Sequence, residues 1–206
     1  MAVNEIQRQQ AMNALALARE AHMDVLRRDG KTPYLQHPMA VATTVRTLGA
    51  ETEVVLAALL HDTVEDGDKL VDWEQRIYQR VGPNVLHLVL WVTKMRGQVG
   101  LNDRRPRAMR LGWELERLKH APEAARLIKL ADIGDNVVAL SANGDAELKQ
   151  DDAKWARKWL GEKGLMLDAL GRETNPGLWD RVDDLIGKTT EWFEFETSLN
   201  MEELTK

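Results

Sequence analysis

The chain has 206 residues, of which 44% are hydrophobic and 30% are charged, and it contains no cysteine. This length and composition fit one globular domain over 1–206, and they exclude a disulfide framework, thiolate metal sites and extended disorder. The net charge of −5 argues against general binding to nucleic acid or to an acidic membrane surface. No apolar run approaches the roughly 20 residues that span a bilayer. Because the first ten residues lack the apolar segment of a signal peptide, we expect a cytoplasmic protein.

The N-terminal segment shows helical periodicity. Apolar residues recur at helical spacing over residues 3–26, which predicts a first amphipathic helix, and Gly30 follows as a stop signal. Arg27 and Arg28 then close this helix, where cations suit the negative end of the helix dipole. A functional interpretation of the same pair is capture of a phosphate group.

A second helix is predicted after a short loop. Pro33 forbids helix continuation, and His37 stands directly before Pro38, a residue favoured in the first turn of a helix. The predicted helix therefore begins at His37 and runs to about Leu48. A single histidine at a helix start is usually a capping or surface residue. The case for His37 as a functional residue therefore depends on the next motif, which contains a second histidine.

The most informative stretch is the apolar run from Val54 to Leu60, which ends in the ionisable sequence HDTVED. Its leucine and alanine content favours a buried helix that continues into this sequence. At 3.6 residues per turn, Asp62, Glu65 and Asp66 fall on neighbouring faces beside His61. Crowded carboxylates lose hydration and repel one another unless a cation joins them, and an imidazole next to a carboxylate suits Mn, Fe, Co or Zn. The alternative is an acidic helix end that faces water, with His61 as a capping residue.

The rest of the chain also predicts helices, over 73–80, 83–94, 109–119, 122–140, 146–170 and 176–200. We therefore expect an all-α bundle of roughly eight to ten helices, with Trp155 and Trp159 available for packing. In the helix over 122–140, Asp132 interrupts a mostly buried stretch, and a buried carboxylate needs a partner. That partner is either an arginine or the same cation that His37, His61 and Asp62 would bind, which gives a two-histidine, two-aspartate site with open positions for water and substrate.

Two segments differ in charge from the rest. Six basic residues and one acid lie between Lys94 and Arg110, so this basic island is either a solvated loop or an electrostatic funnel for a phosphorylated ligand. The C-terminal helix over 176–200 belongs to an acidic tail. This tail could form a homodimer contact or a lid, although packing of Trp179, Trp192 and Phe195 onto the core is the simpler use.

Four motifs in this order resemble the hydrolase domain of RelA/SpoT-type proteins, which belong to the HD-domain superfamily of metal-dependent phosphohydrolases. They are PYLQHPMAVA from Pro33, LAALLHDTVED from Leu56, VGPNVLHLVLWVTKM from Val81 and IKLADIGDN from Ile128. The resemblance covers about residues 18–170, and the chain is similar to a stand-alone small alarmone hydrolase. It implies a helical HD-domain bundle that binds one Mn²⁺ and removes the 3′-pyrophosphate of guanosine tetra- or pentaphosphate.

The resemblance also implies roles for individual residues. His37, His61, Asp62 and Asp132 match the metal ligands, and Glu65 and Asp66 match the acids that handle water. Arg27, Arg28 and Asn136 match residues that contact the substrate. The sequence departs from the family after Asp132, where Ile133, Gly134 and Asp135 replace Arg-Leu-His, and Ala139 replaces a threonine.

These departures leave the metal ligands in place and affect the contacts to base and sugar. An adenosine alarmone therefore stays open as a substrate, as does the 2′-phosphate of NADPH. The competing classes are an HD phosphatase for another nucleotide and a metal-free binding module on the same helices. Because all four ligand positions are filled, the sequence argues against the binding module.

Overall fold

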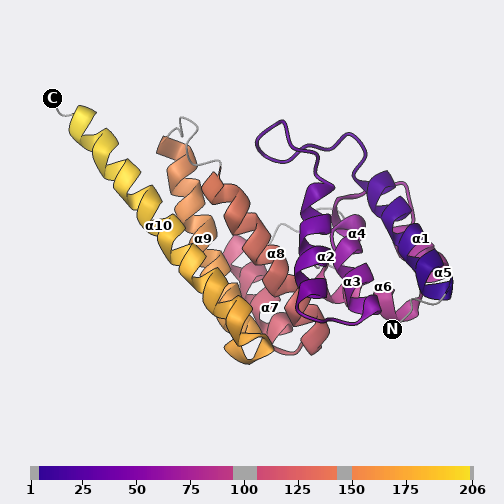
Figure 1. The fold of residues 1–206 in the computed structure, drawn as a ribbon. Coiled ribbons are helices and arrows are strands. Elements are labelled where there is room, and N and C mark those ends of the chain that lie inside the picture. The colour runs from indigo at the N-terminus through magenta and orange to yellow at the C-terminus, as the bar shows by residue number, and fades with distance from the viewer. Residues whose placement is uncertain (1–4, 95–105, 143–149, 205–206) are drawn as a thin grey trace.

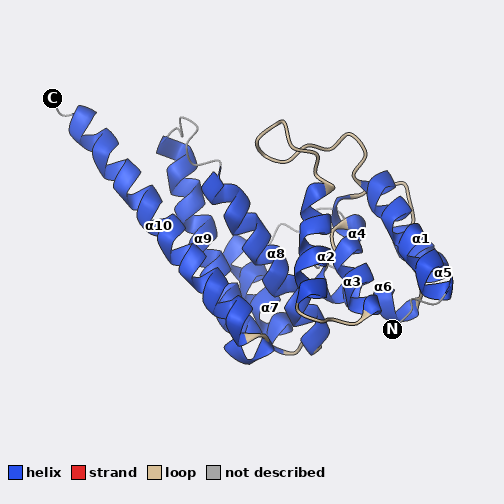
Figure 2. Cartoon of the chain, viewed as in Figure 1, coloured by secondary structure: helices blue, strands red, loops and turns tan. Residues whose placement is uncertain are grey.

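The computed structural model describes residues 5–94, 106–142 and 150–204, with side chains over 5–94, 106–142 and 153–194. Ten α-helices and one 3₁₀ turn form this part of the chain, and no strand lies within it. The predicted all-α bundle is therefore confirmed (Figure 2). The first half contains α1 (Glu5–Ala21), α2 (Gln36–Thr47), α3 (Thr52–Leu60), α4 (Thr63–Asp66), α5 (Trp73–Arg80) and α6 (Pro83–Val92). The second half contains α7 (Arg107–Lys119), α8 (Glu123–Ala142), α9 (Gln150–Leu170), the 3₁₀ turn Arg172–Thr174 and α10 (Pro176–Leu204).

The first helix is shorter than predicted. α1 ends at Ala21 instead of Leu26, because the backbone turns at Asp24, whose φ is 61°. The amide of Tyr34 then donates to the carbonyl of Val25 at 2.8 Å, which pairs the two ends of the following loop. This pairing satisfies backbone groups that a continued helix would otherwise have satisfied.

The loop that follows α1 carries the arginine pair. Asp29 accepts hydrogen bonds from the amides of Lys31 and Thr32, both at 2.8 Å, and Gly30 takes a φ of 66°, so the tip is a tight Asx-type turn. Arg27 and Arg28 consequently lie on this loop and do not close a helix. In Figure 1 the loop extends from the top of the bundle, between α1 and α2.

The predicted continuous helix through Asp66 is interrupted at its ionisable residues. α3 ends at Leu60 and α4 begins at Thr63, while Asp62 between them has φ −97° and ψ −4°. His61 is the C-terminal cap of α3, and both His61 and Asp62 keep right-handed helical dihedral angles between α3 and α4. The side chains of these two neighbouring residues approach one centre, since His61 Nε2 lies 3.1 Å from Asp62 Oδ2.

Two hydrophobic cores share one helix. The first core gathers buried residues of α1, α2, α3, α5 and α6, and the second gathers those of α7, α9 and α10. α8 contributes Ile128 to the first core and Ile133 to the second, so its two faces join the halves of the bundle. Figure 1 shows α8 between the two groups of helices. Any polar residue of α8 near this junction therefore lies between both halves.

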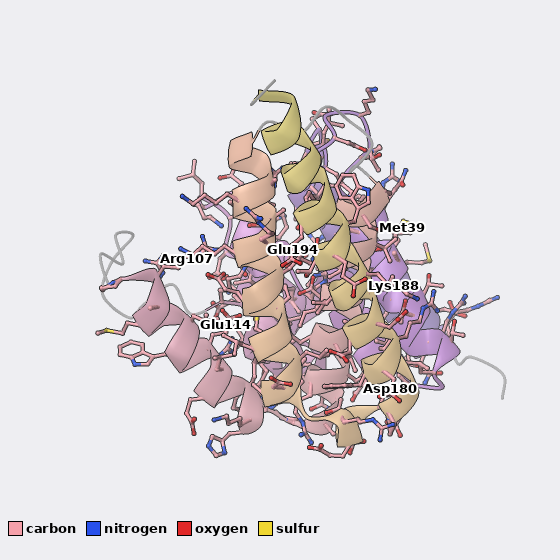
Figure 3. All side chains as sticks on the ribbon, turned by 90° about the vertical axis from the view of Figure 1, so that its left-hand side faces the viewer. Met39, Arg107, Glu114, Asp180, Lys188 and Glu194 are labelled. Carbon is pink, nitrogen blue, oxygen red and sulfur yellow. The ribbon has the colours of Figure 1, made fainter. Side chains whose placement is uncertain are left out.

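The long C-terminal helices cover one side of the second core. Figure 3 shows α9 and α10 side by side, with Asp180 and Lys188 on α10 and Arg107 and Glu114 on α7. Asn175 caps α10, since its side chain accepts from the amide of Leu178 at 2.9 Å.

Candidate metal centre

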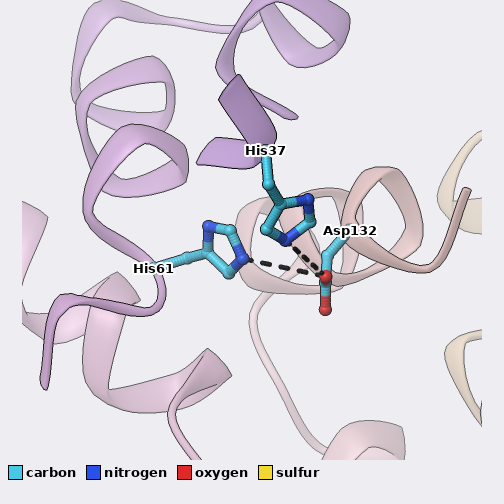
Figure 4. A group of neighbouring side chains, drawn as sticks. All are labelled: His37, His61 and Asp132. Carbon is cyan, nitrogen blue, oxygen red and sulfur yellow. Dashed lines mark ion pairs between the residues drawn. The ribbon is translucent and has the colours of Figure 1, made fainter. Parts of the chain in front are cut away.

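The structure brings together the four residues that the sequence predicts as metal ligands. His37 lies in the first turn of α2, His61 ends α3, Asp62 follows it, and Asp132 lies on α8. Figure 4 shows His37, His61 and Asp132 pointing toward one another from three elements. Potential ligand atoms of these three residues lie within 4.8 Å of one another, and all three residues are buried. The group can hold one divalent ion.

The distances define a common centre at the Nε2 atoms of the two histidines. His37 Nε2 lies 3.2 Å from Asp132 Oδ1 and 3.5 Å from Asp62 Oδ2. His61 Nε2 lies 3.1 Å from Asp62 Oδ2 and 3.7 Å from Asp132 Oδ1. The two imidazoles meet nearly edge to face, with ring centroids 5.0 Å apart.

The other nitrogen of each histidine is already engaged. His61 Nδ1 lies 2.8 Å from the carbonyl of Ala58, and His37 Nδ1 lies 2.7 Å from Asp135 Oδ2. Each Nδ1 donates its proton to these acceptors, which leaves Nε2 available as a ligand. Both Nε2 atoms are buried and neither has a well-directed hydrogen bond. A cation at their common centre would satisfy both, so the donor set fits a divalent metal.

The charges of the metal-free cluster are strongly coupled. Burial alone would raise the pKa of Asp132, yet Lys129 at 2.8 Å and the two histidines hold it well below its ordinary value. Burial would lower the pKa of His37, but the nearby carboxylates of Asp132, Asp135 and Asp62 raise it to about 11. The pKa of His61 likewise rises to about 9 despite burial, mainly through Asp62. A divalent ion would take the place of the protons that these shifts favour, because imidazole and carboxylate ligands bind metal in their deprotonated forms.

Three residues that support the site were not assigned to it from the sequence. Tyr34 donates to Asp62 Oδ2 at 2.6 Å, Lys129 pairs with Asp132, and Asp135 orients His37. Tyr34 stands in the motif around His37 and Lys129 stands in the motif around Asp132, so the sequence offered a signal for both residues. For Asp135 the sequence offered only one signal, namely that this residue departs from the family pattern after Asp132.

The two predicted water-handling acids have different surroundings. Glu65 accepts from the ammonium of Lys94 at 2.8 Å and from its backbone amide at 3.1 Å. Asp66 lies 3.4 Å from the hydroxyl of Tyr34, and burial together with Asp62 and Glu65 raises its pKa. Burial and the neighbouring acids thus favour proton uptake by Asp66, whereas Glu65 is bound to Lys94.

The predicted substrate residues lie around the same centre. Arg27 donates to Asp135 Oδ2 at 2.8 Å, and the guanidinium of Arg28 lies 3.9 Å from the ring centroid of Trp155. Asn136 donates to Asp132 Oδ1 at 2.6 Å, so its amide supports a candidate ligand. Contact with a nucleotide stays a prediction for all three.

Only part of the basic island falls within the described residues. Arg107 forms a two-point ion pair with Glu162, with both bonds at 2.7 Å, and Lys94 pairs with Glu65. Arg96, Arg104 and Arg105 lie outside the described residues. The funnel interpretation of the island therefore stays a prediction.

Comparison with known families identifies the class of this fold and site. The HD domain family matches residues 14–155. Relatives named guanosine-3′,5′-bis(diphosphate) 3′-pyrophosphohydrolase MESH1 include that of Danio rerio, 30% identical over 84% of this chain and 91% of the relative. The relative from Xenopus tropicalis is 35% identical over the same shares. The chain thus belongs to the HD-domain family and, within it, to the group of the MESH1 pyrophosphohydrolases.

A solved structure agrees in fold. It is the structure of a metazoan ortholog of SpoT that is described as hydrolysing ppGpp and playing a role in starvation responses. It matches with a TM-score of 0.72 and 27% identity, covering 91% of this chain and 97% of the other. Within the described residues, no helix has the length and apolar character that crossing a membrane requires.

Proposed function

We propose that this protein hydrolyses guanosine 3′,5′-bis(diphosphate) or a closely related purine alarmone at the 3′ position. The observation that carries this proposal is the pair of buried His37 and His61 Nε2 atoms that converge with Asp132 on one centre. The names of the MESH1 relatives support the substrate class. Water adds to the phosphorus attached to O3′, the O3′–P bond breaks, and O3′ takes up a proton. The products are pyrophosphate and a nucleoside 5′-diphosphate.

The metal ligands proposed are His37, His61, Asp62 and Asp132, and the metal proposed is Mn²⁺. Two imidazoles and two carboxylates form a mixed N/O donor set that suits this ion and its transition-metal neighbours. A bound divalent ion would lower the pKa of a water molecule and polarise a phosphoryl oxygen. Tyr34 holds Asp62 in place, Lys129 holds Asp132, and Asp135 fixes the orientation of His37.

The residues around the centre have separate roles in this proposal. Asp66 takes the proton of the attacking water, and Glu65 keeps Lys94 beside the reacting phosphate. Arg27 and Arg28 offset the charge of the nucleotide, since guanidinium groups bind phosphate through paired hydrogen bonds. Asn136 sits between the centre and the sugar.

Product analysis tests the proposal directly. The Mn²⁺-loaded protein should convert guanosine 3′,5′-bis(diphosphate) into GDP and pyrophosphate, which phosphorus NMR and ion-exchange chromatography distinguish from orthophosphate. The same assay is run with the adenosine analogue and with NADPH as alternative substrates. Release of orthophosphate, or faster turnover of NADPH than of either alarmone, would replace this proposal with a nucleotide phosphatase of the same family.

A further inference from the structure

One face of α9 carries two aromatic rings and an ammonium group in a single row. Trp155, Trp159 and Lys163 are spaced four residues apart, so they lie above one another on the helix surface. The two indole rings stack with centroids 6.0 Å apart and an interplanar angle of 22°. Arg28 lies over Trp155 at one end of this α9 row, and Lys163 Nζ lies 5.0 Å from the ring of Trp159 at the other.

The α9 row runs alongside the metal centre. Arg28 follows Arg27 in the chain, and Arg27 is bonded to Asp135, the partner of His37. At the other end, Lys163 interacts electrostatically with Lys129 and with the candidate ligand Asp132. Eight residues of helix span about 12 Å, which is long enough for one nucleotide to contact the row with both its base and a phosphate group.

Lys163 forms no hydrogen-bonded ion pair with an acid among the described side chains. The one hydrogen-bond contact of its ammonium within that part of the chain is the sulfur of Met166, at 3.5 Å. Of the two acids whose charges act on Lys163, Asp132 is bound to Lys129, whereas Glu114 lies within electrostatic range but forms no ion pair with Lys163 among the described contacts. A partly buried ammonium without an ion pair is costly, and a phosphate group would provide a bound negative charge. Burial, followed by the charge of Lys129, accordingly lowers the pKa of Lys163 to about 8.

Trp155 is partly exposed at the end of the row opposite Lys163. Although the sequence makes Trp155 available for packing, 38% of this residue remains exposed beside Arg28. An exposed indole next to a guanidinium is an effective surface for a nucleobase, since every base has a flat face for stacking and arginine adds cation–π attraction. Simple packing would not require the ring to remain accessible.

We propose that the α9 row is the nucleotide-recognition surface, with the purine base stacked at Trp155 beside Arg28 and the 3′-pyrophosphate bound by Lys163. This assignment rests on the proposed function and adds the side chains that read the two ends of the substrate. Trp159 joins the two subsites and keeps the row rigid. Lys163 and Trp155 are thus substrate-binding residues from the half of the chain that supplies neither histidine.

Two simple probes separate the subsites. Pyrophosphate reports the phosphate end, and GDP reports the base end, each measured by calorimetry on the metal-loaded protein. Lys163→Met should weaken pyrophosphate binding roughly ten- to hundredfold, as expected for the loss of a charge-assisted hydrogen bond. Lys158→Met is the matched control, because Lys158 is exposed on α9 outside the row. It should leave both affinities unchanged.

The base end is tested with Trp155. Trp155→Ala should weaken GDP binding about five- to hundredfold, with little effect on pyrophosphate, whereas Trp155→Phe retains a ring and most of the affinity. GDP should also quench tryptophan fluorescence less in Trp155→Phe than in the parent protein. Circular dichroism verifies that each variant is folded.

The outcomes also separate this inference from the proposed function. Parent-like binding of GDP by Trp155→Ala and of pyrophosphate by Lys163→Met would overturn the recognition row, even if the parent protein cleaves the alarmone. Failure of the parent protein to release pyrophosphate, with both binding effects intact, would overturn the proposed reaction and keep the row as a nucleotide site.

Discussion

The two halves of the bundle contribute differently to the site. Helices α1–α6 surround His37 and His61, which are each 1% exposed, and the first core lies directly beneath them. Helices α9 and α10 build the second core, and α9 carries Trp155 at 38% exposure. The buried half offers ligands that only a cation or protons can satisfy, while the second half offers a surface from which a ligand can displace water. We infer that the first half supplies most of the proposed catalytic centre, while the second half adds the α9 contact of Trp155 with the proposed substrate residue Arg28.

The two halves of the bundle meet at α8, which contributes residues to both cores. Asp132 faces the histidines, whereas Ile133 next to it belongs to the second core. A perturbation of either half can therefore reach the metal centre, but through different contacts. The following changes test how far the halves are separable, beginning with the largest expected effect.

Removing a ligand from the first half should abolish the centre. His61→Ala removes one of the two converging nitrogen atoms, so bound Mn²⁺, expected at about one ion per chain, should fall to background and hydrolysis should fall by several orders of magnitude. Elemental analysis and a pyrophosphate-release assay measure both. Full metal content in this variant would show that His61 is not a ligand.

The two acids after the ligand pair should differ in effect. Asp66→Asn is expected to reduce kcat by about 10²–10⁴-fold with metal content and KM little changed, which is typical of a lost general base. Glu65→Gln should reduce it less, because Glu65 is held by Lys94. Steady-state kinetics of the two variants side by side decide the assignment, and a larger loss in Glu65→Gln would reverse it.

A matched pair of core truncations compares the halves directly. Leu60 and Leu160 are both fully buried, one beside His61 in the first core and one beside Trp159 in the second. Each change to alanine should lower the free energy of unfolding by about 2–5 kcal/mol, measured by urea denaturation. Leu60→Ala should also weaken metal binding, whereas Leu160→Ala should retain the metal and raise KM. Equal effects on the metal would mean that the halves are not separable.

Asp135 tests the support that α8 gives to the first half. Asp135→Asn weakens the acceptor of the His37 Nδ1 proton and the partner of Arg27, so metal affinity should fall about 10–100-fold. Titration with Mn²⁺ measures the change. Because Asp184 is an exposed acid on α10, Asp184→Asn serves as the control and should leave the affinity unchanged.

The smallest expected effect concerns pH at the second half. Lys163 faces Lys129 and Asp132 from α8, Lys94 after α6 and Glu114 from α7, and its pKa is lowered to about 8. The charged form binds phosphate and exists below this pKa, so pyrophosphate affinity should decline as pH rises through about 8. Lys163→Arg stays charged over this range. The ratio of parent to variant affinity should therefore fall severalfold between about pH 7 and 9, and a constant ratio would contradict the role of Lys163.

The sequence by itself determined the helical class and predicted the residues of the candidate centre. Apolar spacing identified the helices, and the adjacent His61 and Asp62, with His37 at a helix start and Asp132 in an apolar stretch, indicated the proposed ligand set, whose members lie close together in the structure. These signals are local, because helix periodicity and motif spacing depend on residues close in the chain. They do not show where a regular element is interrupted, which is why the ends of the first helix and of the helix after Val54 were predicted wrongly.

Only the tertiary structure decided which distant groups meet. Arg27 and Asp135 are 108 positions apart, and their ion pair depends on a loop that folds back from α1 to α8. The contact of Arg28 with Trp155 likewise joins the first half to α9. Periodicity tells which face of a helix is apolar but not which element that face will meet, since packing of whole helices sets these pairings. For this reason the proposed ligands could be named from the sequence, whereas their contacts with Tyr34, Lys129 and Asp135 and the contact of Arg28 with Trp155 could not.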